Sequence, residues 1–372
     1  MNILNYTEPI NTPDKELPSF LSHFYKDEKV LFFDIETTGF LANNTTLYLI
    51  GVLWYEDGML KIRQWFNEDG KSEVDLIHAF EEFSSQFSLL VHFNGAGFDL
   101  PYLKQKAEQL HTNFTVDSRL NQLDIFKEIR SLKPIFALDN LKQVTIEQYL
   151  GIERTDTYSG GDLIRIYQRF VARPNDEEKH LLLLHNHDDL LGMPQIAKIL
   201  NYRGFFSQLT AKDVHIGAIT TEDSGNKLVI QFHYPEYAFL PRRITCSKDG
   251  LFLKADGNKA SLQVPIVRNT LRHYFSDYKN YYYLPAEDMA VHKSIAAFVE
   301  TGNKKKATKS TCYTKKTDAF IPCFDKETAE TFQYDITDKH LYQSLDSITE
   351  KTGCAADYII HCLKSFDKKR NP

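Results

Sequence analysis

The order of short apolar runs and helical stretches between residues 30 and 200 most restricts what this chain can fold into. Five apolar runs predict strands, at 30–36, 47–55, 60–66, 88–93 and 120–123. Stretches with helical spacing follow the third strand, at 73–86, 98–110, 125–131, 139–150, 162–171 and 176–200. This order predicts an α/β fold in which helices pack on a mixed five-stranded sheet.

A change of sequence character after Tyr202 predicts a second domain. Short strands are expected at 214–220, 227–234, 243–246, 251–255 and 260–264, and helices at 290–301 and 355–365. Up to Asn201 the chain has 19 basic and 30 acidic residues, whereas the remainder has 25 basic and 20 acidic residues. We therefore predict a polar lead-in over 1–28 with one short helix at most, at 19–25, an α/β domain over 29–202, and a smaller basic, β-rich α+β domain over 203–372.

The composition excludes several classes of protein. With 42% hydrophobic and 25% charged residues, the chain is neither mainly disordered nor fibrous. No run of ~18 apolar residues occurs, so we expect no membrane span. The acidic N-terminal segment is unlike a signal peptide. The five cysteines form no CxxC pair, so we expect reduced thiols and a cytoplasmic location.

Two carboxylates stand at the end of the first predicted strand. Asp34 and Glu36 are two residues apart, so their side chains should point to the same side of the sheet. Like charges at this distance raise each other's pKa unless a cation lies between them. The turn Thr37-Thr38-Gly39 that follows would bring the backbone close to a ligand. A solvent-facing strand end is the alternative interpretation.

Further acidic groups follow later in the chain. Asp99 falls in the first turn of a helix, where a favourable interaction with the helix dipole is the simpler explanation. His185 and Asp189 share one face of the helix predicted at 176–200, and the four leucines at 181–184 before them indicate a buried helix, with a surface helix start as the alternative. Asp124 is predicted to cap a helix and Asp188 to be a flanking charge. Acids at two strand ends and on one helix can converge, and their oxygens suit Mg²⁺ or Mn²⁺.

Three segments, in this order, resemble the three motifs of the DEDD superfamily of exonucleases, which has a ribonuclease H-like fold. The segments are Asp34-Ile-Glu36-Thr-Thr-Gly39-Phe40, the core of Asn94, Gly95, Phe98 and Asp99, and His185–Asp189. Residues 138–170 also resemble the segment between the second and third motifs in predicted exonucleases of the bacterial YprB type, at Leu141, Leu150-Gly151-Ile152, Arg154, Gly160-Gly161 and Tyr167. The resemblance covers roughly residues 28–200.

The resemblance implies a role for each matched residue. Asp34, Glu36 and Asp189 would bind the first of two metal ions, and Asp34 and Asp99 the second. Glu36 and the backbone of Thr37 would meet the 3′-hydroxyl of the terminal nucleotide. Three further residues would contact the substrate. Phe40 would be a wedge against the last base, and Asn94 and Phe98 would form the floor of the site. For Phe98, core packing is an equal alternative.

The third motif departs from the family pattern at His185. One branch of the superfamily has Tyr at this position, with the same spacing to its Asp. The other branch has His, but with one more residue before its Asp, and position 190 is Leu here. An imidazole can orient or deprotonate a water near neutral pH, which predicts a catalytic role for His185. A helix residue hydrogen-bonded away from the site is the alternative. His187 is expected to lie outside the site.

These observations predict a two-metal 3′–5′ exonuclease that acts on single-stranded or frayed 3′ ends of DNA or RNA, with Mg²⁺ or Mn²⁺ as cofactor. A catalytically weak nucleic-acid-binding module and a structure-specific endonuclease are the alternatives. In the basic half, lysines and tyrosines suit phosphate tracking and base stacking, or else a solvated loop and a strand. These residues are Arg272, Tyr278, Tyr281, Tyr282, Tyr283, Lys304, Lys305, Lys306, Lys309, Lys315, Lys316 and the tail at 368–370.

Overall fold

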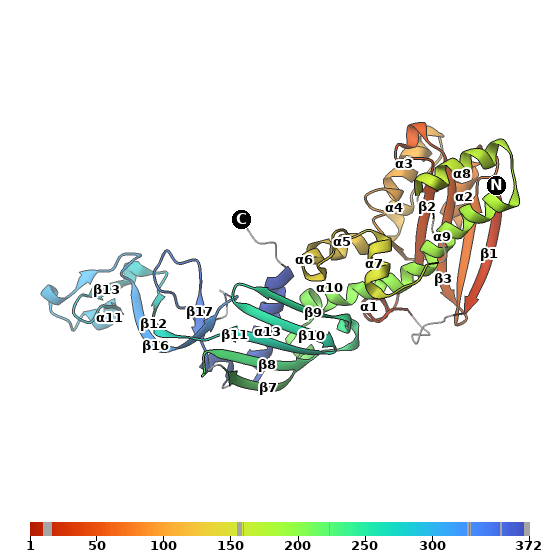
Figure 1. Ribbon diagram of the computed structural model, residues 1–372. Helices are drawn as coiled ribbons and strands as arrows, with labels where there is room; N and C mark the ends of the chain where they lie inside the picture. Colours follow the sequence, from red (N-terminus) through yellow and green to blue (C-terminus); the bar gives the residue numbers. More distant parts are fainter. Residues whose placement is uncertain are drawn as a thin grey trace. The chain divides into compact units, whose positions relative to one another are not determined.

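The computed structural model describes residues 1–9, 17–154, 158, 160–222, 224–325, 327, 329–349 and 352–367 (Figure 1). The basic tail at 368–370 lies outside the described residues. The chain divides into two compact units. Unit 1 contains residues 1–204 and 236–242, and unit 2 contains residues 205–235 and 243–372.

Unit 1 is built on a six-stranded mixed sheet with the spatial order β1-β4-β3-β2-β5-β6. The strands are β1 (Asn2–Pro9), β2 (Val30–Thr37), β3 (Leu47–Glu56), β4 (Met59–Phe66), β5 (Leu89–His92) and β6 (Asn121–Asp124). The first four pair antiparallel, whereas β5 runs parallel to β2 and β6 runs parallel to β5. The ends of β2 and β5 therefore meet at one edge of the sheet.

Helices cover both faces of this sheet (Figure 1). The helices of unit 1 are α1 (Ser19–Phe24), α2 (Glu73–Ser84), α3 (Asp99–Gln109), α4 (Val116–Arg119), α5 (Ile125–Ile129), α6 (Lys133–Phe136), α7 (Gln143–Leu150), α8 (Gly160–Ala172), α9 (Asp176–Ile196) and α10 (Leu200–Arg203), of which α2 and α3 pack on one face and α8 and α9 on the other. One core lies between the sheet and α2 and α3, around Phe33, Phe80 and Leu103. The other lies between the sheet and α8 and α9, around Phe66 and Phe170. The central strands are apolar on both sides because both sides are buried.

The sheet has six strands, so the expectation of five was wrong. The additional strand is β1, from the segment that we expected to be a lead-in without a strand. It pairs with β4 along its whole length, from Asn2 opposite Phe66 to Pro9 opposite Met59. Leu4 packs against the core under α8 and α9. Without β1, the outer edge of β4 would have unpaired backbone groups. The helix expected at 19–25 is α1.

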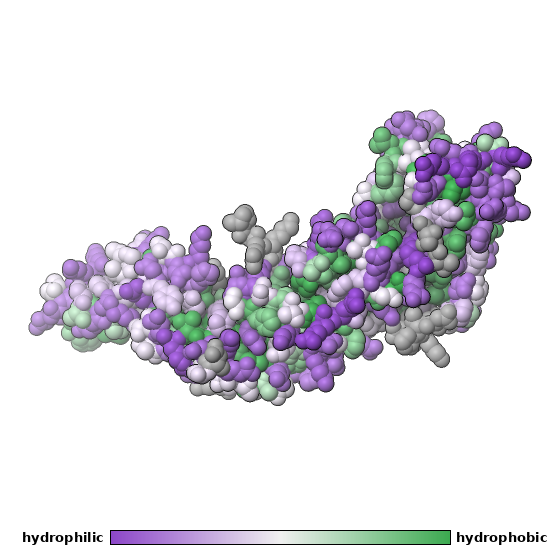
Figure 2. All heavy atoms as spheres, viewed as in Figure 1, coloured by the Kyte–Doolittle hydropathy of each residue, from purple (hydrophilic) through white to green (hydrophobic). Residues whose placement is uncertain are grey.

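Unit 2 is β-rich, with a five-stranded sheet (β7-β8-β11-β10-β9) and two three-stranded sheets (β12-β16-β17 and β14-β13-β15). Its strands are β7 (His215–Glu222), β8 (Lys227–His233), β9 (Leu240–Lys248, from residue 243 on), β10 (Leu251–Gly257), β11 (Lys259–Pro265), β12 (Val267–Tyr274), β13 (Tyr281–Leu284), β14 (Met289–His292), β15 (Lys305–Lys306), β16 (Tyr313–Pro322) and β17 (Tyr342–Ser344). Its helices are α11 (Lys293–Ala296), α12 (Asp346–Thr349) and α13 (Thr352–Asp367). The face in Figure 2 is largely hydrophilic, with scattered hydrophobic patches.

One helix prediction for the second half of the chain was wrong. Residues 289–292 form strand β14 and only 293–296 are helical, although a helix was expected over 290–301. The reason is tertiary, because β13 pairs with β14, with Tyr282 opposite Val291. The tyrosine run is thus a strand, and the hydroxyls of Tyr283 and Tyr313 bind Asp288. Among the helices of the described residues, none is long and apolar enough to cross a bilayer.

Candidate active site

The end of β2 places two carboxylates on one side of the sheet. Asp34 and Glu36 flank Ile35, which points the opposite way into the core. The neighbouring parallel strand β5 leads through a tight turn to Asp99, the first residue of α3. Helix α9 packs across β2 and β3 and carries His185 and Asp189 (Figure 1). The two strand ends and this helix therefore supply the acidic groups of one site.

Three of these side chains lie in direct proximity. Ligand atoms of Glu36, His185 and Asp189 all lie within 4.8 Å of one another. The imidazole lies between the two carboxylates, with its Nε2 atom 3.6 Å from Glu36 Oε1 and 3.5 Å from Asp189 Oδ2. Within the described part of the chain, no other group of three or more His, Cys, Asp or Glu is as close together. This group can hold a metal ion.

Asp34 and Asp99 lie outside that group of three but interact with it. Burial raises the pKa of Asp34 well above its ordinary value, and the charges of Glu36, Asp189 and Asp99 raise it further. Burial also raises the pKa of Asp99 to about 7, and Asp189 contributes to this shift. The four carboxylates therefore repel one another in a buried space, and bound cations would relieve that repulsion.

The neighbours of Glu36 partly offset the effect of burial on its pKa. Burial raises its pKa to about 7, while His185 and a hydrogen bond from Tyr48 act in the opposite direction. The Tyr48 hydroxyl donates to Glu36 Oε2 at 3.3 Å, and its ring stacks on Tyr167 at 4.5 Å. Sequence reasoning missed Tyr48, because a tyrosine within an apolar strand reads as core.

A chain of buried amides holds Asp34 in place. Asn186 is fully buried, and its Nδ2 atom donates to Asp34 Oδ2 at 2.8 Å. Gln64 Nε2 donates to Asn186 Oδ1 at 2.9 Å and to the carbonyl of Leu183 at 3.0 Å. A Cβ at Gly51 of β3 would lie 2.0 Å from Asn186 Oδ1, so the amide fits only beside glycine. The sequence analysis missed this support; a glycine in the middle of an apolar strand was the available signal.

Asp189 is ion-paired as well as close to His185. Its Oδ1 atom lies 2.6 Å from Arg154 Nη1 and accepts a hydrogen bond from Gln143 Nε2 at 3.2 Å. Arg154 also contacts Glu147 Oε2 at 3.0 Å, and the Glu147 side chain is only 1% exposed. Helix α7 and the segment after it thus hold one oxygen of Asp189, while the other faces His185. Sequence reasoning noted Arg154 as part of the resemblance but gave it no role.

The loop after β2 carries the residues expected to meet the substrate. The Thr37 hydroxyl donates to the carbonyl of Gly39 at 2.8 Å. Gly39 has φ 156°, and a Cβ there would lie 2.8 Å from Thr45 Cγ2. Phe40 is 86% exposed, and its ring contacts Phe98 edge-on at 5.8 Å. Phe98 also packs against the core.

The turn between β5 and α3 is held by Asp124. Its carboxylate accepts the backbone N–H groups of Asn94 at 2.9 Å and of Ala96 at 3.2 Å. It also accepts the N–H of Lys127, which confirms the predicted helix cap. Asn94 itself is exposed. His187 lies elsewhere on α9, where its ring contacts Tyr6 of β1, as expected for a residue outside the site.

Comparison with known proteins assigns the fold of this part of the chain. Residues 31–201 match the family model of the RNase_H superfamily. The RNase H-like domain thus includes every residue of the candidate site. The finer assignment to the DEDD superfamily and its YprB-type members stays a prediction.

One solved structure similar to this chain is that of the family B DNA polymerase from the hyperthermophilic archaeon Pyrobaculum calidifontis. The TM-score is 0.40 and the sequence identity is 14%, over 68% of this chain and 35% of the polymerase chain. The match therefore spans about a third of the polymerase. No curated protein matches the sequence.

Proposed function

We propose that the RNase H-like domain is a divalent-metal-dependent 3′–5′ exonuclease that acts on DNA or RNA. The observation that carries this proposal is the convergence of Glu36, His185 and Asp189 within 4.8 Å, together with the repulsion between these carboxylates and those of Asp34 and Asp99. A phosphodiester anion would be repelled by four carboxylates alone. With cations between them, the same oxygens would form a site for the terminal phosphate.

The donor set fits Mg²⁺ or Mn²⁺, because hard oxygen ligands predominate. Asp34, Glu36 and Asp189 would hold the first ion, and Asp34 and Asp99 the second. When bound, such ions stabilise the negative charge that develops on the phosphoryl and leaving oxygens. Asn186 and Tyr48 orient Asp34 and Glu36 for this role.

His185 is proposed as the proton acceptor for the attacking water. Its imidazole lies between Glu36 and Asp189, whose carboxylates would orient the ring. Phe40 supports recognition of a strand end, because its exposed ring beside Phe98 offers a surface for the last base. The backbone of Thr37 would meet the 3′-hydroxyl.

Labelled oligonucleotides test this proposal. Single-stranded DNA and RNA carrying a 5′ label are incubated with Mn²⁺ or Mg²⁺, and products are resolved by length. We expect a ladder that shortens from the 3′ end, no cleavage of a circular single strand, and loss of activity in Asp34→Asn. A protein that leaves every substrate intact, or an Asp34→Asn variant as active as the wild type, contradicts the proposal. Cleavage of the circle would instead indicate an endonuclease.

One observation favours a second candidate, a nucleic-acid-binding module with weak catalysis. Arg154 already supplies a positive charge to Asp189, so metal ions could be held less tightly. Calorimetric titration with Mn²⁺ separates the candidates. Stoichiometric binding that disappears in Asp34→Asn supports the exonuclease. Oligonucleotide binding without any Mn²⁺ site supports the second candidate.

A further inference from the structure

A basic groove lies beside the carboxylate cluster in unit 1. It has a volume of about 590 Å³ and is lined from the end of β5, from α5 and α6, and from the start of α7. This volume is within the ~300–1,000 Å³ of ordinary ligand sites. Three of its lining residues are cations, Arg130, Lys133 and Lys142, and two are aromatic, Phe93 and Phe126.

The charge of the groove is opposite to that of its surroundings. Among the described residues no carboxylate lines it, although acidic residues outnumber basic residues by 30 to 19 in the sequence up to Asn201. Arg130, Lys133 and Lys142 are all exposed. Among the residues that the structure describes, no carboxylate forms an ion pair with any of the three. The side chain of Lys133 donates to the backbone carbonyl of Asp139, at 2.6 Å. Three such cations attract an anion.

Two residues that line the groove link it to the candidate active site. Gln143 lines it and also donates to Asp189 Oδ1 at 3.2 Å. Asn94 also lines it and belongs to the turn that leads to Asp99. A ligand that follows the groove would therefore reach the carboxylate cluster at these two amides.

The aromatic residues give the groove a second kind of contact. Phe93 and Phe126 are half-buried, and their rings meet edge-on at 6.1 Å. Partly exposed rings stack on the bases of single strands without regard to sequence, at roughly 1–3 kcal/mol for each base. Cations for phosphates and rings for bases together match a single-stranded nucleic acid.

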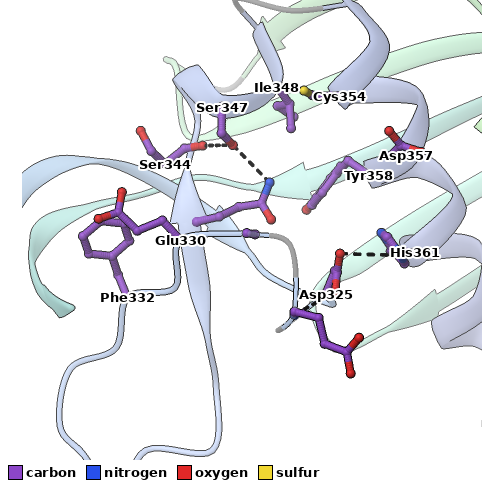
Figure 3. A pocket seen from close by; sticks show the side chains of 13 residues that line it. Asp325, Glu330, Phe332, Ser344, Ser347, Ile348, Cys354, Asp357, Tyr358 and His361 are labelled. Atoms are coloured by element: carbon purple, nitrogen blue, oxygen red, sulfur yellow. Dashed lines mark hydrogen bonds and ion pairs between the residues drawn. The ribbon is translucent and has the colours of Figure 1, made fainter. Parts of the chain in front are cut away.

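We propose that the basic groove binds the single strand behind the terminal nucleotide, with its cations on the phosphates and its rings on the bases. This proposal rests on the exonuclease function and names the path of its substrate. A pocket of about 650 Å³ in unit 2 provides a contrast, because carboxylates line it (Figure 3). Asp325, Glu327, Glu330 and Asp357 would repel a phosphate backbone there.

The test measures binding without cleavage. Fluorescence anisotropy with labelled single-stranded DNA and RNA decamers, in EDTA, gives the affinity as a function of salt concentration. The groove variant is Arg130→Glu/Lys133→Glu/Lys142→Glu. Its control, Lys26→Glu/Lys71→Glu/Arg173→Glu, makes the same charge change at exposed cations of unit 1 that do not line the groove.

We expect the groove variant to bind at least about tenfold more weakly than the control variant. The slope of log affinity against log salt should fall by about 2, since each phosphate contact on a single strand contributes about 0.7. If the triple variant does not fold, the single variants Arg130→Ala and Lys142→Ala replace it. Each should lower the slope by about 0.7. Unfolding curves establish that each variant is folded.

The outcomes separate this proposal from the proposed function. Equal affinity of the groove and control variants overturns the groove, whether or not the wild type cleaves. A wild-type protein that does not bind the decamers also overturns it. Groove-dependent binding without any cleavage supports the groove and contradicts the exonuclease. If thymidine monophosphate binds as tightly as the decamer, the groove holds a single nucleotide and the proposed strand path is wrong.

Discussion

The guanidinium of Arg154 lies between the carboxylates of Glu147 and Asp189, at 3.0 Å and 2.6 Å. Glu147 has no room to move toward solvent, because its side chain is 1% exposed and lies against Gly192, where a Cβ would be 2.7 Å from Oε1. The positive charge of Arg154 therefore stabilises the buried carboxylate of Glu147.

Arg154→Gln should lower the free energy of unfolding by roughly 3–5 kcal/mol, because it leaves a buried carboxylate without its partner. The double variant Arg154→Gln/Glu147→Gln should recover most of this loss, since two amides can hydrogen-bond without a net charge. Urea unfolding of the wild type and both variants measures the difference. A single variant as stable as the wild type would show that Glu147 does not depend on this ion pair.

His185 and His187 are two positions apart on α9 and offer a matched pair of substitutions. His185→Ala should lower kcat by about 10²–10⁴-fold with little change in KM, because the proposed proton acceptor is lost. His187→Ala should leave the rate unchanged, since that ring lies against Tyr6 and Glu8 of β1. Initial rates on a 5′-labelled oligonucleotide give both values. Equal rates for the two variants would assign His185 a structural role instead.

At the scale of elements, Gly51 on β3 fixes how closely α9 packs on the sheet. Gly51→Ala would place a Cβ 2.0 Å from Asn186 Oδ1 and 2.7 Å from Leu190 Cδ1. We expect a loss of ~1–3 kcal/mol in the free energy of unfolding, as for other overpacked sites. Activity should fall too, because Asn186 would be displaced from Asp34.

Gly160→Ala is the control for this substitution. Gly160 begins α8, and a Cβ there would meet nothing within 4 Å. Thermal unfolding with an activity assay should show an unchanged or slightly more stable control. If Gly51→Ala behaves like the control, the contact between Asn186 and β3 does not position the site.

The strands β2 to β6 could be predicted because their pattern is local. The apolar run of β2, for example, ends in acids where the strand reaches the edge of the sheet. Strand β1 was missed because its stability comes from pairing with β4, and half of its residues are exposed. Residues 290–292 were expected to be helical for the same kind of reason, since β13 supplies the pairing that makes them a strand.

In the candidate site, too, residues in local sequence patterns could be predicted, whereas pairs that are distant in the sequence could not. Asp34, Glu36, Asp99 and Asp189 stand in recognisable segments, so the sequence points to them directly. Arg154 lies 35 positions from its partner Asp189, and Gln64 lies 122 positions from Asn186. Only the packing of α7 and β4 against α9 brings these pairs together, and no local pattern encodes it.

At the scale of the whole molecule, the carboxylate cluster makes the stability of the metal-free protein depend on pH. The pKa of Glu36 is raised from 4.5 to about 7, and that of Asp99 from 3.8 to about 7, chiefly by burial. Between the unfolded and folded pKa values, the folded state binds more protons than the unfolded state. Stability contributed by these groups is therefore present below the unfolded pKa and is lost as the pH rises to about 7.

In EDTA, we expect the free energy of unfolding to fall as the pH rises through this window, by at most about 1.4 kcal/mol for each unit of pKa shift. Glu36→Gln should flatten the fall, whereas Glu108→Gln, which removes an exposed carboxylate of α3, should not.

Saturating Mn²⁺ should reverse the loss of stability at alkaline pH, by ~2.7 kcal/mol at a hundredfold excess over Kd. Urea unfolding across pH with each variant provides the measurement. If the free energy of unfolding of the metal-free wild type depends on pH in the same way as that of Glu36→Gln, the carboxylates do not repel one another in the folded protein. The main physical reason for cations at the site would then be lost.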